Sequence, residues 1–96
     1  MAPNAKVLLI PILKGWQQLP VGQLIGISTD LDEVDAARAL AEELKRVDCM
    51  FIEGSENAIP WRDEYFDEAY LGCPLTDEIR RVMKPEGTIH ECPDGF

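Results

Sequence analysis

Residues 49–71 constrain the fold of this chain more than any other stretch. They read CMFIE, then an acidic loop that contains Ile59-Pro60-Trp61, then FDEAYL a little further on. The first and last segments are short, apolar and rich in aromatic or branched side chains, which is typical of buried strands. The polar residues 54–64, with their proline, favour a loop. The stretch therefore predicts two strands, at 49–53 and 66–71, joined by a long loop.

Three further segments predict strands. Residues 7–10 read VLLI, a continuous apolar run that fits a strand buried on both faces of a parallel sheet. Pro11 ends this run, because proline cannot donate a hydrogen bond to a neighbouring strand. Residues 23–27 and 88–92 are further short strand-like segments. Residues 12–19 fit either a short helix or an irregular loop.

Helices are expected between these strands. Residues 31–46 carry apolar side chains at helical spacing, and either Thr29 or Asp30 can cap their first turn. A shorter helix is expected over residues 76–83, with Thr76 as its cap. Strands that alternate with helices predict right-handed crossovers and a parallel sheet. We expect a minimal Rossmann-like, three-layer α/β sandwich with about five mostly parallel strands and about three helices.

The order of these segments resembles the middle and end of the class I S-adenosylmethionine (SAM) methyltransferase domain, in its type 11-like form. The resemblance is specific at residues 49–71 and again at 78–87, where EIRRVMKPEG is similar to the family's helix-to-strand junction. It is weak before Gly26. The resemblance implies the sheet order 3-2-1-4-5. It also implies that residues 1–96 form a single truncated domain, because the family's last two strands do not fit after residue 92.

Several positions that hold the cofactor in this family differ here. Where the family has a glycine-rich turn after its first strand, residues 11–15 read PILKG. Without gaps, Ser28 takes the place of the acid that binds the ribose, and a shift of two residues gives that place to Asp30. Ser55 takes the place of the acid that meets the adenine. The resemblance assigns no catalytic residue and no metal ligand. If SAM binds, it implies contacts from Ser28, Asp30, Ser55 and Glu56, with Gly15 or Gly26 at the closest approach of the chain.

These differences lower the expected affinity for the cofactor. Each charge-assisted hydrogen bond that is lost costs about 1.5–3 kcal/mol, so two losses weaken binding by roughly two to four powers of ten. We expect a methyltransferase-like domain without autonomous catalysis that acts by self-association or by binding a protein partner. The open edge of the expected fifth strand is its expected contact. The rival hypothesis is a small SAM-dependent methyltransferase with atypical cofactor contacts, and a third is a cleft for another small ligand.

Composition limits the other function classes. Nine basic and eighteen acidic residues give a net charge of −9, which repels nucleic acid. The longest apolar run, residues 7–13, is too short to span a membrane. Three cysteines without a pairing motif suit the reducing cytosol, and the first residues show no signal-peptide pattern. We therefore expect a cytoplasmic protein that binds neither nucleic acid nor membranes.

A few other residues allow a functional and a simpler interpretation. His90 and Cys92 point to one face of the expected fifth strand, and Cys73 ends the strand beside it. They could bind zinc or copper, or act as a nucleophilic pair, but their spacing matches no metal motif. Buried thiols and a surface histidine are the simpler interpretation. Trp61 and Tyr65 could likewise either stack on a ligand or pack a loop against the core. Trp16 is expected to cover the sheet. The pairs Glu42-Glu43 and Arg80-Arg81 are expected to be solvated helix faces.

Overall fold

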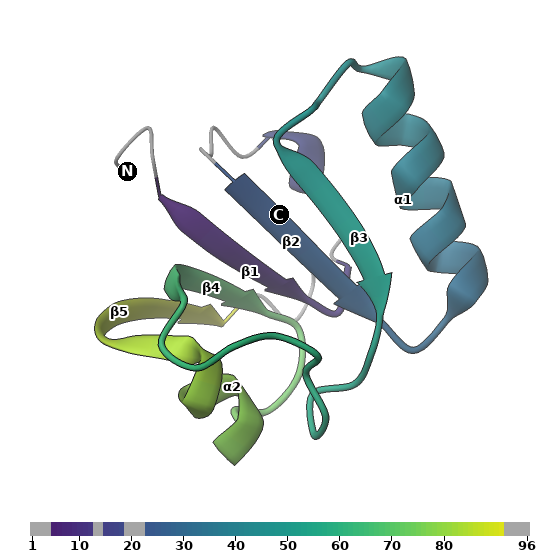
Figure 1. The fold of residues 1–96 in the computed structure, drawn as a ribbon. Coiled ribbons are helices and arrows are strands. Elements are labelled where there is room, and N and C mark those ends of the chain that lie inside the picture. The colour runs from purple at the N-terminus through teal and green to yellow at the C-terminus, as the bar shows by residue number, and fades with distance from the viewer. Residues whose placement is uncertain (1–4, 13–14, 19–22, 92–96) are drawn as a thin grey trace.

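A single parallel sheet organises the molecule. The computed structural model describes residues 5–12, 15–18 and 23–91, and within them the sheet has the strand order β3-β2-β1-β4-β5 (Figure 1). All four neighbouring pairs are parallel. The strands are β1 (Lys6–Ile10), β2 (Gln23–Ser28), β3 (Cys49–Glu53), β4 (Phe66–Leu71) and β5 (Met83–Glu91). The expected Rossmann-like fold and its strand order are confirmed.

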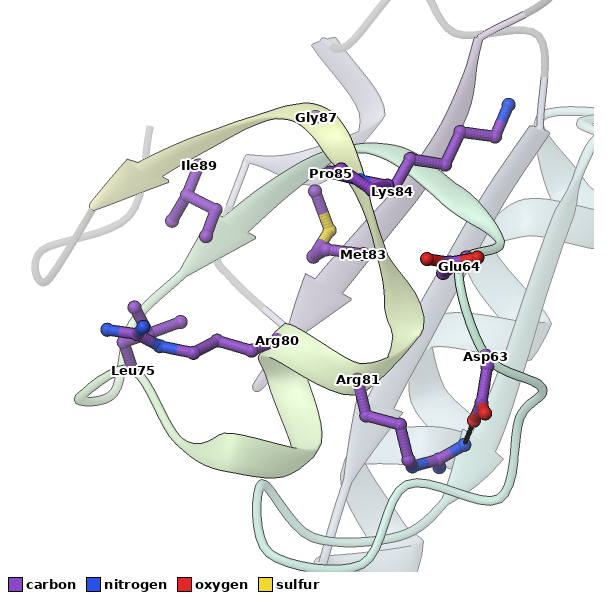
Figure 2. Close-up of a pocket in the computed structure, with 10 residues that line it drawn as sticks. All are labelled: Asp63, Glu64, Leu75, Arg80, Arg81, Met83, Lys84, Pro85, Gly87 and Ile89. Carbon is purple, nitrogen blue, oxygen red and sulfur yellow. Dashed lines mark hydrogen bonds and ion pairs between the residues drawn. The ribbon is translucent and has the colours of Figure 1, made fainter.

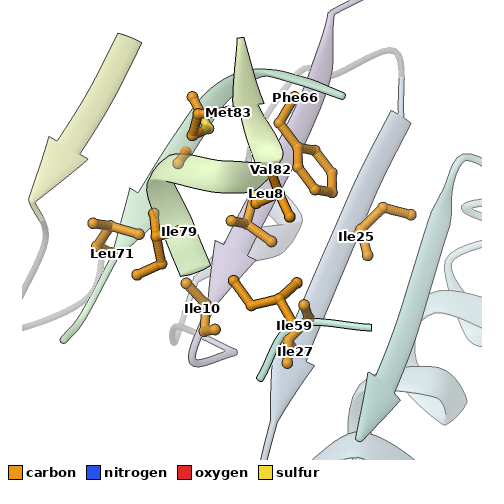
Figure 3. Packing of buried hydrophobic residues seen from close by; sticks show 11 residues of the cluster. Leu8, Ile10, Ile25, Ile27, Ile59, Phe66, Leu71, Ile79, Val82 and Met83 are labelled. Carbon is orange, nitrogen blue, oxygen red and sulfur yellow. The ribbon is translucent and has the colours of Figure 1, made fainter. Parts of the chain in front are cut away.

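The core lies on both faces of the sheet, which explains the continuous apolar runs of β1 and β2. One face packs against α2 (Asp77–Val82) and the loop before β4 (Figure 3). The other face packs against α1 (Leu31–Glu43) and the short 3-10 helix η1 (Trp16–Gln18). The first cluster comprises Leu8, Ile10, Ile25, Ile27, Ile59, Phe66, Ala69, Leu71, Ile79, Val82 and Met83, and the second Ala5, Val7, Leu9, Trp16, Leu24, Val34, Ala37, Ala41 and Phe51.

Helix α1 begins and ends with local hydrogen bonds. Asp30, and not Thr29, is its N-cap, and the Asp30 carboxylate accepts a bond of 2.9 Å from the Asp32 N–H. The helix ends at Glu43, before the expected residue 46. Lys45 has a left-handed φ of 57°, and the N–H groups of Lys45 and Arg46 bond back to the carbonyls of Glu42 and Ala41. This is a Schellman turn, and it stops the helix.

The last helix and strand also differ from their expected bounds. Helix α2 ends at Val82, and β5 already begins at Met83 and not at residue 88. The N–H of Tyr65 donates to the carbonyl of Val82 at 2.8 Å, so the chain joins β4 directly after the helix. The pairing register between β4 and β5 shifts between Phe66 and Glu68, and this shift accommodates the additional residues of β5. Cys92, expected in this strand, lies outside the described residues.

The aromatic residues pack as structural groups. Trp16 is 4% exposed and its ring lies 4.8 Å from that of Phe51, so it covers the sheet as expected. The ring of Trp61 meets that of Tyr65 at 5.4 Å, and the Tyr65 hydroxyl donates to the Gln23 side chain at 2.7 Å. The simpler interpretation, packing of the loop against the core, accounts for both. None of the helices in the described ranges is long and apolar enough to cross a membrane.

Candidate cofactor edge of the sheet

The carboxyl ends of the parallel strands meet at one edge of the sheet, where ligands bind in folds of this kind. Two backbone hydrogen bonds join these ends: the Gly54 N–H donates to the Ser28 carbonyl, and the Gly72 N–H to the Ile10 carbonyl, both at 3.0 Å. The ends of β1, β2, β3 and β4 therefore lie side by side. The residues that the resemblance implies as cofactor contacts follow β2 and β3 at this edge.

Ser28 and Asp30 already have hydrogen-bond partners. Ser28 is only 5% exposed, and its hydroxyl oxygen accepts a bond of 3.1 Å from the Asp30 N–H. Asp30 is exposed and caps α1 through the bond to Asp32. The Ser28 hydroxyl thus stabilises the turn into the helix, while the Asp30 carboxylate keeps a solvent-facing oxygen that a ligand could reach.

Ser55 and Glu56 belong to a tight loop after β3. Residues Ser55 and Ala58 form an isolated bridge, and the Ser55 hydroxyl oxygen accepts a bond of 3.3 Å from the Asn57 N–H. The backbone carbonyl of Glu56 accepts a hydrogen bond from the hydroxyl of Thr76, the residue that caps α2. The structure therefore ties this loop to α2 and gives both residues a local structural role.

The space above Gly26 is filled by protein side chains. A Cβ atom at Gly26 would lie 2.5 Å from the Phe51 ring and 3.3 Å from the Ile12 side chain. Gly26 thus makes room for Phe51, which is 1% exposed and packs with the partly buried Ile12 in the core under α1. Gly15 has a φ of 88°, which favours glycine at this turn, but residues 13 and 14 beside it lie outside the described part of the chain.

The residues proposed as a metal or nucleophile site have other partners. His90 lies 3.1 Å from the Glu68 carboxylate and stacks on Tyr70 at 4.5 Å. The Cys73 thiol lies 3.7 Å from the Ile10 carbonyl, and burial, with a smaller effect from the charge of Glu56, raises the pKa of Cys73. This cysteine is therefore a protonated, weak nucleophile. Over residues 5–12, 15–18 and 23–91, no group of three His, Cys, Asp or Glu side chains gathers in a way that could hold a metal ion.

Arg81 has a structural role that the sequence pattern did not indicate. Its guanidinium contacts Asp63 at 2.5 Å (Figure 2). It also contacts Glu78 at 2.6 Å and donates to the carbonyls of Ile59 and Trp61 at 2.8 and 2.9 Å. The expectation that both arginines form a solvated face is wrong for Arg81, because it fixes the loop before β4 to α2. Arg80 is exposed as expected. The acidic residues of that loop were the only signal in the sequence for this contact.

A hollow of about 650 Å³ lies beside Arg81, away from the cofactor edge. Its floor is apolar, with Leu75, Met83 and Ile89, and charged side chains of both signs form its rim (Figure 2). It opens next to the start of β5, whose partner Phe66 begins β4. It therefore lies toward the amino ends of these strands, and the candidate cofactor contacts take no part in it.

Comparison with solved structures agrees with this fold. The YcgJ protein from Bacillus subtilis superposes with a TM-score of 0.76 at 24% identity, over 88% of this chain and 42% of that one. A putative methyltransferase complexed with the Trm112 methyltransferase activator, from Haloferax volcanii, gives a TM-score of 0.76 at 21% identity, over 93% and 45% of the two chains. A SAM-dependent methyltransferase from Aquifex aeolicus gives 0.70 at 19%, over 85% and 52%.

These comparisons establish the fold. The chain spans about half the length of the structures that it matches. No model of a protein family matches the sequence, and no curated protein matches it either.

Proposed function

We propose that this chain is a truncated methyltransferase-like domain, residues 1–96, that has no catalysis of its own and acts through self-association or a protein partner. The observation that carries the proposal is the local bonding of Ser28 and Ser55, neutral residues at positions where the resemblance implies carboxylates. Each hydroxyl accepts a hydrogen bond from the backbone N–H two residues further on. This arrangement supports weak binding of SAM.

The burial of the Ser28 side chain supports the proposal. Its side chain is only 5% exposed and its oxygen already accepts a bond from the Asp30 N–H, so a ribose would have little access to it. A neutral serine also gives a weaker hydrogen bond than a carboxylate, by about 1 kcal/mol or more. We therefore propose SAM affinity in the millimolar range or weaker, in place of micromolar.

Partner binding is proposed on the form of the sheet. Strand β5 pairs with β4 along one side, and no described strand covers its other side. An open edge of this kind can pair with a strand of another chain. The structural neighbour from Haloferax volcanii is a putative methyltransferase in complex with the Trm112 methyltransferase activator, which supports partner binding as a mode of action for this fold. A homodimer or a partner at β5, in the cytoplasm, is the arrangement that the resemblance implies, and β3 is the second edge strand at which a partner could pair.

The alternative function is a small SAM-dependent methyltransferase. The exposed Asp30 carboxylate at the end of β2 favours it, since it could bind a ribose with Ser28 beside it. Ser55 and Glu56 would then face the adenine. SAM would supply an electrophilic methyl group, and these side chains would bind and orient its nucleoside.

Isothermal titration calorimetry with SAM and with S-adenosylhomocysteine separates the two functions. We expect no saturable heat up to about 1 mM of either ligand, because the neutral Ser28 and Ser55 stand where the resemblance implies carboxylates. Adenosine serves as a control for weak binding of the nucleoside alone. A dissociation constant near micromolar for SAM, lost in an Asp30→Ala variant, would overturn the proposal and establish the alternative.

A further inference from the structure

The outer edge of β3 exposes backbone groups that are available for pairing. Within the sheet, the Leu24 N–H donates to the Asp48 carbonyl and the Gly54 N–H donates to the Ser28 carbonyl. Because backbone direction alternates along a strand, the even-numbered residues of β3 bond to β2. The N–H and C=O groups of Cys49, Phe51 and Glu53 therefore point away from the sheet.

Two of these outward groups already have partners within the chain. The Arg38 side chain reaches from α1 and donates from Nε to the Phe51 carbonyl at 2.8 Å. At the beginning of the strand, the Cys49 N–H donates to the Arg46 carbonyl at 3.4 Å. More than half of the Arg38 side chain is exposed and its contact with Asp35 is a 4.0 Å surface ion pair, so an added strand would displace few contacts of this residue. It occupies a position that the N–H of an added strand would take.

Three large apolar side chains are exposed next to this edge. Leu44, Val47 and Met50 are 46%, 99% and 48% exposed, and they follow one another from the end of α1 into β3. Only one other large apolar side chain in the described residues, Leu31, is comparably exposed. Exposed apolar side chains concentrated in a short stretch are typical of a contact surface.

A groove runs between α1 and β3. It has a volume of about 370 Å³, and its walls come from Arg38, Ala41 and Glu42 on the helix side and from Cys49 and Phe51 on the strand. A strand added to β3 would send alternate side chains toward this groove and the others toward the opposite face of the sheet. The groove is thus placed to select side chains, as in other cases where a peptide extends a sheet.

The two edges of the sheet differ in protection. Strand β5 contains Pro85, an exposed Glu86 and a register shift, and these features discourage pairing. Strand β3 has no proline, no glycine and no bulge, and its five residues read CMFIE. Of the two edges, β3 is therefore the better template for another strand.

We propose that the outer edge of β3 binds an extended segment of a different protein, with apolar side chains at alternate positions and basic residues at its ends. A second copy of this chain is disfavoured because each copy carries a net charge of −9. Glu42 lines the groove together with the basic Arg38 and Arg46, and α1 carries further exposed carboxylates at Asp32, Asp35 and Glu43. Basic residues in the partner would complement them. The inference deepens the proposed function, since it rests on a role in partner binding.

A synthetic peptide tests this inference directly. The probe alternates valine and threonine between pairs of lysines, and carries a fluorescent label for anisotropy measurements. We expect saturable binding that is at least about tenfold weaker in a Val47→Ser/Met50→Thr variant. The ¹³C signal of the Met50 methyl group should shift on binding, while that of the buried Met83 stays in place.

The controls separate binding at this site from non-specific binding. Leu31→Ser removes an equally exposed leucine at the other end of α1 and should leave the affinity within about twofold. The same peptide flanked by glutamates should bind at least about tenfold more weakly. Absence of saturable binding up to about 1 mM, or an equal loss in Leu31→Ser, would overturn the inference. So would a dimer, seen by sedimentation, that Met50→Thr abolishes.

This result is independent of the cofactor titration. Tight SAM binding would remove the non-catalytic role but leave the β3 edge free to bind the peptide. If the peptide fails to bind, the proposed interaction at β3 is rejected and the cofactor result is unchanged.

Discussion

At the residue scale, the Arg81 side chain decides how the long loop before β4 is held. Its guanidinium is one-third exposed, so its ion pairs with Glu78 and Asp63 contribute little by themselves. Its bonds to the carbonyls of Ile59 and Trp61 matter more, because they are charge-assisted and join the loop to α2. The planar fork of arginine suits this set of acceptors, and lysine cannot reproduce it.

We expect Arg81→Lys to lower the free energy of unfolding by about 2 kcal/mol, because two charge-assisted hydrogen bonds to the loop are lost or weakened. Urea unfolding followed by Trp fluorescence measures this change, since Trp61 lies in the same loop. Arg80→Lys is the matched control and should stay within about 0.5 kcal/mol of the parent, as expected for an exposed side chain. Equal stability of the two variants would show that the loop does not depend on Arg81.

At the scale of the elements, the Schellman turn at the end of α1 carries a cost. Lys45 sits at a left-handed position with φ of 57°, where a side chain is strained and glycine is favoured. We expect Lys45→Gly to raise the free energy of unfolding by about 0.5–1 kcal/mol, after the larger chain entropy of glycine is subtracted.

Thermal or urea unfolding measures that gain. Lys45→Ala is the control, because it removes the same charge and keeps the strain, so it should not stabilise the protein. A gain of equal size in both variants would mean that the charge of Lys45, and not its backbone conformation, was the cause.

Sequence patterns predicted the elements that depend on local signals. The apolar runs of β1 and β3, the helical spacing of α1 and the caps at Asp30 and Thr76 are encoded within a few neighbouring residues, and the structure confirms them. The early start of β5 depends on Tyr65 bonding to Val82, and the contacts of Arg81 bridge about twenty positions. Such long-range contacts leave no periodic signal in the sequence.

The candidate site was likewise predictable only in part. The family resemblance could align Ser28 and Ser55 with positions that bind the cofactor, because these residues follow strands whose ends are recognisable. It could not foresee that the Phe51 ring would lie over Gly26, since this depends on the packing of β3 against β2. Whether the aligned serines touch a ligand is a prediction for the calorimetric titration.

At the scale of the whole molecule, Asp67 links the first strand to the last. Its carboxylate accepts a hydrogen bond of 2.9 Å from the Lys6 N–H in β1 and pairs with Lys84 in β5 at 2.8 Å. The bond from Lys84, followed by that from the Lys6 backbone, lowers the pKa of Asp67 below its ordinary value of 3.8. A lowered folded-state pKa means that the ionised form stabilises the fold above pH 3.8, and that this contribution disappears as the pH falls through the lower, folded-state value.

We therefore expect Asp67→Asn to destabilise the protein at pH 7 by about 1 kcal/mol, a modest value because the carboxylate is partly exposed. The difference between the variant and the parent should shrink as the pH is lowered below 3.8 and the parent's own carboxylate becomes protonated. Urea unfolding at a series of pH values measures it, with Glu86→Gln on the exposed side of β5 as a control that should follow the parent throughout. A difference that stays constant down to the lowest pH would mean that Asp67 holds the three strands through its shape and hydrogen-bond geometry, and not through its charge.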